Sequence, residues 1–283
     1  MREALSKNPS NNHGYEVRGE QLWFKGRLVL PQNSRFKNAL LWEFHDTPIR
    51  GHSRIFRTYK RVATSFYWVC MKKDIQDYVQ RCDVCQRNKH DSLTPAELLQ
   101  PLPILDRVWE NMFMDFIEGL PSLNGFSVIL VVVDRLSKYG HFIALKHPYI
   151  AKGVAEIFLK EVVRLYGMPR SIVSDRDPIF TSQFWSEFFQ LQGSELRMSS
   201  AYHPQTDGQT EVLNRCLKTY LCCFVNSKQK QWLQWLPWAE YWYNTNYHTT
   251  TCILILRWFT VELQPPFITT NMALQRLHRW RYH

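Results

Sequence analysis

The chain of 283 residues has no long hydrophobic run, since its longest uninterrupted apolar stretch is the six residues from Val128 to Val133. A transmembrane helix needs about 20 apolar residues, so the sequence predicts no membrane span. The first 30 residues are polar and mixed in charge, without the apolar core of a signal peptide. No internal repeat or low-complexity tract stands out. Hydrophobic residues make up 45% of the chain, which excludes a wholly disordered protein.

Cysteine is scarce and odd in number, with seven residues scattered unevenly. Without a secretory signal, this usage favours a reducing compartment over a disulfide framework. A CxxC pair in that setting is more often a metal ligand pair than a disulfide.

Positive charge is in excess, and it is concentrated at one end. The formal net charge is +10, and residues 1–100 alone contribute +7 of it. Such an excess favours a polyanionic partner, most often nucleic acid. Many basic proteins bind no nucleic acid specifically, so charge alone does not decide the matter.

The first third of the chain has a mixed strand and helix pattern. We expect a mobile tail at residues 1–13 and short strands within 15–30. Three helices are expected at about 33–45, about 52–63 and about 71–81, and a proline-containing linker at 91–103. Asn33 or Ser34 is placed to cap the first helix.

The remainder alternates between strands and helices, which is typical of an α/β architecture. Expected strands are 112–119, 127–133, 141–146 and 171–174, and expected helices are 151–166, 181–191, 208–224 and 231–244. Together they predict a mixed sheet flanked by helices.

Two histidines and a CxxC pair in the first third have the pattern of a metal site: His45, His52, Cys82 and Cys85. Zinc prefers four N and S ligands in a tetrahedron, and two His with two Cys give a closed, structural site. The alternative is two surface histidines and a chance CxxC. The other cysteines are interpreted as packing residues: Cys70, Cys216, Cys222, Cys223 and Cys252.

Three carboxylates in the second part are candidates for catalysis. Asp115 interrupts an apolar strand, Asp175 follows a short strand, and Glu211 lies on a helix after the HPQTDG turn. Three such acids can converge on two Mg²⁺ ions in phosphoryl transfer. Taken singly, each has an ordinary explanation, as a strand-end residue, a turn former and a solvated helix position.

The segments MDFIEGLP, VVVDRLSKYGHFIALKH, IVSDRDPIFTSQFW, SSAYHPQTDGQTEVLNR and AEYWYNTNYH resemble the integrase of gypsy-type long-terminal-repeat retrotransposons, most closely those of plants. The resemblance runs from about Tyr15 to His248. It implies a small helical zinc-binding domain followed by a ribonuclease-H-like core, an α/β fold with a mixed five-stranded sheet. The zinc ligands of the family fall on the two histidines and the CxxC pair. Its Asp, Asp, Glu triad falls on Asp115, Asp175 and Glu211, with the thirty-five residues between the last two that the family requires.

The resemblance implies an enzyme, a polynucleotidyl transferase and endonuclease that trims the 3′ ends of element DNA and joins them to target DNA. Its implied cofactors are two Mg²⁺ or Mn²⁺ ions at the triad and one structural Zn²⁺. Its implied partners are the element ends, target DNA and further copies of the chain, acting in the nucleus after transport in a cytoplasmic particle. The implied division is a tail with short strands (1–31), a zinc-binding domain (32–90), a linker (91–107), a catalytic core (108–250) and a degenerate tail (251–283).

Candidate DNA contacts follow from helix geometry. Arg215 and Lys218 lie four and seven residues after Glu211, on the same helical face, although a solvated basic stripe is the simpler explanation. Tyr202 lies in the HPQ turn and is a candidate for contact with a terminal nucleotide. The tryptophans at 232, 235, 238 and 242 have helical spacing and are expected to pack in a core or subunit contact.

Other acids near the triad receive lesser roles. Asp177 is expected to shape the turn before Pro178, and Asp134 to act as a turn residue after its strand. Asp207 lies one helical turn before Glu211 and is a candidate for a supporting role.

Two departures from the family stand out. Arg50 and Arg54 replace glycines that usually surround the second histidine, which strains the turn if either position needs φ > 0. After Thr251 the chain reads CILILRWFTVELQPP instead of the usual continuation. A competing interpretation is therefore a catalytically impaired remnant that only binds DNA or a partner. A ribonuclease-H-type nuclease is disfavoured by the zinc motif.

Overall fold

The computed structural model describes residues 14–88, 107–198, 204–225 and 231–245. The chain divides into two compact units, with the boundary in the sequence between Arg87 and Asn88. The predicted tail, linker and C-terminal segment (1–13, 91–103 and 251–283) lie largely or wholly outside the described residues.

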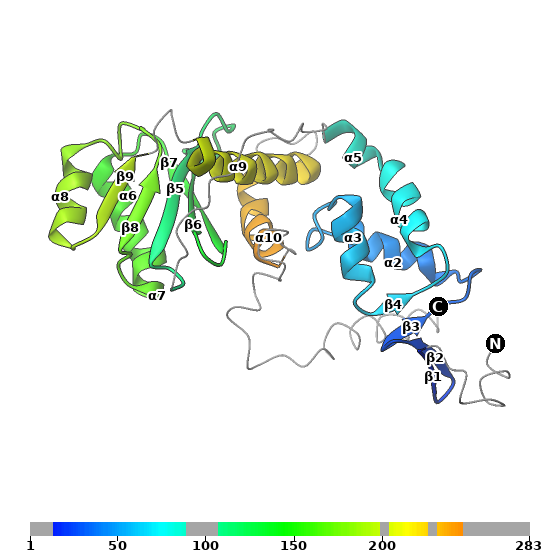
Figure 1. Cartoon of the computed structure of the whole chain (residues 1–283). Coiled ribbons are helices and arrows are strands. Elements are labelled where there is room, and N and C mark those ends of the chain that lie inside the picture. Colours follow the sequence, from blue (N-terminus) through cyan, green and yellow to red (C-terminus); the bar gives the residue numbers. More distant parts are fainter. Residues whose placement is uncertain (1–13, 89–106, 199–203, 226–230, 246–283) are drawn as a thin grey trace. The chain divides into compact units, whose positions relative to one another are not determined.

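In its described residues, the first unit combines a small sheet with helices (Figure 1). Its strands are β1 (Tyr15–Arg18), β2 (Gln21–Phe24), β3 (Arg27–Val29) and β4 (Phe66–Tyr67), in that order across the sheet. Its helices are α2 (Phe36–His45), α3 (Ile55–Val62), α4 (Met71–Gln80) and α5 (Asp83–Asn88). The three predicted helices are confirmed with shorter bounds, whereas β4 and α5 were not predicted.

Turn chemistry and apolar packing account for this unit. Lys25 and Gly26 have φ values of +49° and +75°, as a tight two-residue hairpin turn requires. Leu28 of β3 pairs with Phe66 of the parallel strand β4. Both side chains are buried in one core with residues of α2, α3 and α4. That core positions the ends of the helices, where the predicted metal ligands lie.

The second unit contains a mixed five-stranded sheet in the order β7-β6-β5-β8-β9. Its strands are β5 (Asn111–Ile117), β6 (Phe126–Asp134), β7 (Gly140–Lys146), β8 (Ser171–Ser174) and β9 (Glu195–Met198). Strands β5, β8 and β9 are parallel, while β6 is antiparallel to both of its neighbours. The predicted α/β architecture with a ribonuclease-H-like core is confirmed, and β9 is an addition to the predicted strands.

Helices cover both faces of this sheet. They are α6 (Ala151–Phe158), the π-helical stretch η2 (Leu159–Val163), α7 (Arg164–Tyr166), α8 (Gln183–Leu191), α9 (Pro204–Val225) and α10 (Trp232–Asn244). The predicted helix at 151–166 is thus interrupted by a π-helical turn. One core joins α9 and α10 to residues such as Phe113 and Val173, and another joins α6 and α8 to residues such as Met114 and Ile172. Alternate residues of β5 and β8 therefore face opposite helical layers.

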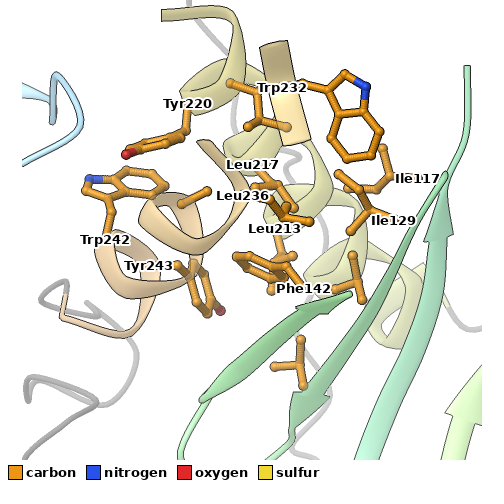
Figure 2. Close-up of a cluster of buried hydrophobic side chains, with 14 of the residues drawn as sticks. Ile117, Ile129, Phe142, Leu213, Leu217, Tyr220, Trp232, Leu236, Trp242 and Tyr243 are labelled. Atoms are coloured by element: carbon orange, nitrogen blue, oxygen red, sulfur yellow. The ribbon is translucent and has the colours of Figure 1, made fainter. Parts of the chain in front are cut away.

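Figure 2 shows the first of these cores, where Leu213 and Leu217 of α9 point toward Ile117 and Ile129 of the sheet. The predicted packing role of the tryptophans is confirmed for Trp232 and Trp242, which are 1% and 5% exposed, and for Trp235, which packs against this core. Trp238 is 45% exposed and does not pack in this core, so for it a subunit contact stays a prediction.

Two of the predicted packing cysteines do not pack. Cys70 and Cys222 are exposed, Cys216 is half-buried and Cys223 is buried. Cys252 lies outside the described residues. In the part of the chain that the structure describes, no helix combines the length and apolar character of a membrane span.

Candidate functional site

The four predicted zinc ligands come together in the first unit. His45 ends α2, His52 lies in the loop before α3, Cys82 follows α4, and Cys85 lies in α5. Their ligand atoms all lie within 4.8 Å of one another. His45, His52 and Cys85 are buried. Packing of four separate elements therefore assembles a closed donor set.

The spacing of these donors fits zinc. His45 Nε2 lies 3.3 Å from Cys85 Sγ, and His52 Nδ1 lies 3.4 Å from Cys82 Sγ. Zn–N and Zn–S bonds of about 2.0 and 2.3 Å at a tetrahedral angle place N and S about 3.6 Å apart. Each imidazole and thiol pair is thus close to the separation of two ligands around one ion.

Thr58 orients the first histidine. The Thr58 hydroxyl donates its one proton to the carbonyl of Ser53 at 3.1 Å, and it lies 3.4 Å from His45 Nδ1. It therefore accepts from Nδ1–H, which leaves the lone pair of His45 Nε2 directed toward Cys85. Such outer hydrogen bonds fix the tautomer and the ring orientation of a metal ligand.

A buried arginine secures the loop that carries His52. Arg61 is 7% exposed, and its Nη1 donates to the carbonyl of Arg50 and to Ser53 Oγ, each at 3.1 Å. Burial, and then the charges of Arg50 and Arg57, lower the pKa of Arg61. A guanidinium remains charged in proteins, so these two oxygens solvate a buried cation.

The expected strain at Arg50 and Arg54 does not arise. The residues with positive φ in this loop are Gly51 (+63°) and His52 (+46°). Arg54 has φ −63° as the residue before α3. The side chain of Arg50 lies over the ring of Phe44 at 5.0 Å. The arginines that stand at positions 50 and 54, in place of the glycines usual in the family, therefore do not strain the turn.

Sequence reasoning missed Thr58 and Arg61. Both lie on α3, which is rich in basic residues and reads as a solvated helix. The signal available was periodicity, since Thr58, Arg61 and Val62 share the buried face of that helix.

In the second unit, Asp115 and Asp175 are neighbours across two strands. Met114 of β5 pairs with Ser174 of the parallel strand β8, so the two acids occupy the next position along each strand. Adjacent strands lie about 4.8 Å apart. Both carboxylates are half-buried. They share the face covered by α9, because Phe113 and Val173, two residues earlier, lie in the core with that helix.

Helix α9 reaches Asp115 through an amide. Asn214 Nδ2 donates to Asp115 Oδ2 at 2.7 Å, and the amide of Phe116 donates to Asp115 Oδ1 at 2.7 Å. Glu211 lies three residues before Asn214, on the adjacent turn of the same helix. It is exposed and forms an ion pair of 2.5 Å with Arg215. The helix thus brings Glu211 to the region of Asp115.

The structure does not close the triad. Among the described residues, the His and Cys group of the first unit is the one cluster of potential ligands close enough to hold a metal ion. Asp115 and Asp175 lie side by side, whereas Glu211 is directed to Arg215. Lys218 is exposed on α9. Tyr202 and the side chain of Asp207 lie outside the described residues.

The two lesser acids are structural. Asp177 Oδ1 accepts from the amide of Ile179 at 2.8 Å, which shapes the turn at Pro178 as expected. Asp134 is fully buried and accepts hydrogen bonds from the amide of Trp109 and from the amide and hydroxyl of Ser137. Its oxygens are thereby used to hold the turn after β6.

A fourth carboxylate at the same end of β5 was missed. The hydroxyl of Tyr149 donates to Glu118, one residue beyond β5. Burial, that hydrogen bond and the nearby charges of Asp177 and Asp175 raise the pKa of Tyr149. The tyrosine remains a neutral donor beside the acids. Tyr149 lies just beyond one of the matched segments, but it is 31 positions from Glu118, so no local pattern indicates the pairing.

The chain is similar both to a known domain family and to known polyproteins. Residues 32–91 match the family described as Integrase zinc binding domain. Over 227 residues, 80% of this chain, the sequence is 33% identical to the Transposon Tf2-3, Tf2-4 and Tf2-5 polyproteins of Schizosaccharomyces pombe. The matched region is 17% of the length of each of these relatives. The first unit therefore contains an integrase-type zinc-binding domain with a His₂Cys₂ site.

Proposed function

We propose that this chain is the integrase of a long-terminal-repeat retrotransposon of the gypsy type, as it is found in plants. Its zinc-binding domain matches that of integrases, and the relatives that it resembles over 80% of its length are named transposon polyproteins. The proposed activity is trimming of the 3′ ends of element DNA and joining of those ends to target DNA.

The main support for the proposed activity is the adjacency of Asp115 and Asp175 at one edge of the core. Both strands are packed in the sheet, so both acids are held on rigid elements. Asn214 links α9 to Asp115, which keeps Glu211 near them. With divalent cations held by these acids, the arrangement would orient a phosphodiester across them on one side of the sheet.

The donor set fits magnesium in its chemistry, because Asp115, Asp175 and Glu211 offer the hard carboxylate oxygens that Mg²⁺ prefers. When bound, two divalent ions supply charge stabilisation for the attacking and leaving oxygens of phosphoryl transfer. Asn214 and Arg215 hold two of these carboxylates by hydrogen bonds. We propose that both yield those contacts when the ions bind.

The DNA partners follow from the same proposal. Arg215 and Lys218 on α9 contact the phosphates of a bound element end, and Tyr202 contacts its terminal nucleotide. The enzyme acts as a homo-oligomer that holds two element ends, in the nucleus after delivery in a cytoplasmic particle.

The test is a nicking assay with a duplex that carries the terminal repeat flanking this chain's own coding sequence. The zinc-loaded chain is expected to trim the 3′ end in the presence of Mg²⁺ or Mn²⁺, and Asp115→Asn to bind the duplex without trimming it. Equal trimming by Asp115→Asn would remove the acid from the mechanism.

One observation favours a second candidate. Glu211 is paired with Arg215 rather than with the other two acids, an arrangement that a remnant that only binds DNA or a partner would keep unchanged. The same assay separates the two, because the remnant binds the duplex and leaves it intact with either metal ion.

A further inference from the structure

Three cations lie on the face of the core sheet that carries the two acids. Arg135 and Lys138 lie in the turn after β6, and Arg197 lies on β9. The guanidinium of Arg135 lies 5.2 Å from the ring centroid of Phe113, and the ammonium of Lys138 lies 5.9 Å from it. We call Arg135, Lys138 and Arg197 the cationic cap.

The cap lies on the face that carries the acids. Phe113 pairs with Val173 across β5 and β8, and Val173 pairs with Arg197 across β8 and β9. These three side chains therefore form one row on one face of the sheet. Asp115 is two residues beyond Phe113 on the same strand, about 6.6 Å away along the strand and on the same face.

The turn is built to hold its cations there. The amide of Arg135 donates to the carbonyl of Asn111 at 2.9 Å, which ties the turn to the start of β5. Lys138 adopts a left-handed φ of +65°, an uncommon conformation for a residue with a side chain. The two carboxylate oxygens of the buried Asp134 fix the turn, because Oδ1 accepts from the amide of Trp109 and Oδ2 accepts from the amide of Ser137. Arg197 also forms an ion pair of 2.7 Å with Glu195 on its own strand.

We propose that Lys138 and Arg197 of the cationic cap bind backbone phosphates of the DNA strand whose reacting phosphodiester lies at Asp115 and Asp175, while Arg135, which is 8% exposed, adds its charge from beneath the surface. The proposal rests on the proposed function, and it adds a second phosphate contact surface to the one on α9. Phosphate contacts position a duplex without reading its sequence, so the cap sets the path of the strand over the sheet.

The electrostatics favour an anion at this surface. Burial is the largest cause that lowers the pKa of Arg135, and the charge of Arg197 lowers it further. Burial, and then the charge of Arg135, lower the pKa of Lys138 to about 8. Like charges near one another are unfavourable, and a bound phosphate relieves that repulsion.

The experiment measures how binding of a DNA duplex depends on salt, with the full zinc-loaded chain and fluorescence anisotropy. Each lost phosphate contact lowers the slope of log K against log salt by about 0.9. The weakening of binding between about 50 and about 200 mM salt should then be about 3.5-fold smaller per contact. We expect this change for Lys138→Met and for Arg197→Gln, and twice this change in slope for the double variant.

Two controls make the result specific. Lys160→Gln removes an exposed cation from η2, which packs on the opposite face of the sheet, and it should keep the wild-type slope. Lys138→Arg retains the charge, and it should keep that slope too.

A wild-type slope in both charge-removing variants would overturn the cap while leaving DNA binding through α9 in place. An equal loss with Lys160→Gln would also overturn it, as an effect of net charge. Absence of DNA binding by the wild-type chain would instead overturn the proposed function, and the cap with it.

Discussion

The two metal-ligand sets of this chain differ in how far folding alone assembles them. The four zinc donors lie within 4.8 Å of one another and are mostly buried. The three carboxylates are not brought together to the same extent, because Asp115 is hydrogen-bonded to Asn214 and Glu211 is hydrogen-bonded to Arg215. Thiols and neutral imidazoles pack closely at little cost, whereas carboxylates that share a site repel one another. The zinc centre is therefore part of the fold, whereas we propose that the carboxylate site closes only with its cations and substrate.

The largest effect should follow from loss of a zinc ligand. Cys85→Ser removes a buried ligand, and structural zinc contributes on the order of 10 kcal/mol to the folding of small domains. The first unit should lose its helices, and the variant chain should retain no zinc. Circular dichroism and metal analysis of the full chain check this.

Cys70→Ser is the matched control, because Cys70 is exposed and lies outside the ligand cluster. It should bind one zinc ion with unchanged helicity. Retention of full helicity by Cys85→Ser, or by the wild type after exhaustive chelation, would show that zinc is not part of this fold.

A smaller effect is expected at Thr58, which tests whether the zinc site is preorganised. Thr58→Val keeps the shape of the side chain but removes the hydroxyl that accepts from His45. Zinc affinity should fall by about 10- to 100-fold, as measured by competition with a chromophoric chelator. Thr58→Ser restores the hydroxyl and should restore the affinity. Equal affinities of the Val and Ser variants would exclude the orienting role.

In the second unit, the burial of Lys138 and its repulsion by Arg135 should be visible as a dependence of stability on pH. Lys138 has a pKa of about 8 in the folded chain against 10.5 for the ordinary group. Between these values the unfolded chain binds more protons, so the free energy of unfolding rises with pH. The rise from this lysine should be about 2 kcal/mol. In denaturant titrations, Lys138→Met should show a smaller rise over this range, and identical profiles would contradict the assignment.

The smallest effect should be the stabilisation of the core by magnesium. A site that closes only with its cations binds them weakly, and at ten times the dissociation constant a ligand adds about 1.4 kcal/mol. The melting temperature of the wild type should rise slightly with Mg²⁺, and that of Asp175→Asn should not. An equal rise in both would place the ion elsewhere.

The parts of the site that the sequence predicts are those fixed by residue type and spacing. His45, His52 and the CxxC pair are distinctive because few other roles need that set of ligands. Thr58 and Arg61 act through packing that exists only after α3 docks, so periodicity indicates that they are buried but not which groups they hold. No local pattern reveals the pairing of Tyr149 and Glu118, which meet across 31 positions of sequence.

The limits of the fold prediction have a similar origin. Strand β9 has the sequence ELRM, and it becomes a strand because it pairs in parallel with β8. Strand β4 is two residues long and depends on β3 in the same way. In contrast, the long apolar run of β6 is buried on both faces, and it is apparent from composition alone.

The central claim is that Asp115 and Asp175 act together in cleaving DNA, and cleavage of the terminal-repeat duplex tests it most directly. Asp177→Asn is the matched control, because this acid holds the turn at Pro178 and has no proposed catalytic role. With Mn²⁺, we expect Asp115→Asn and Asp175→Asn to lose cleavage by at least about 100-fold each, on the scale of a lost electrostatic contact in a transition state, while Asp177→Asn cleaves within a few-fold of wild type. Wild-type cleavage by Asp115→Asn or Asp175→Asn, in chains that retain zinc, would contradict the account.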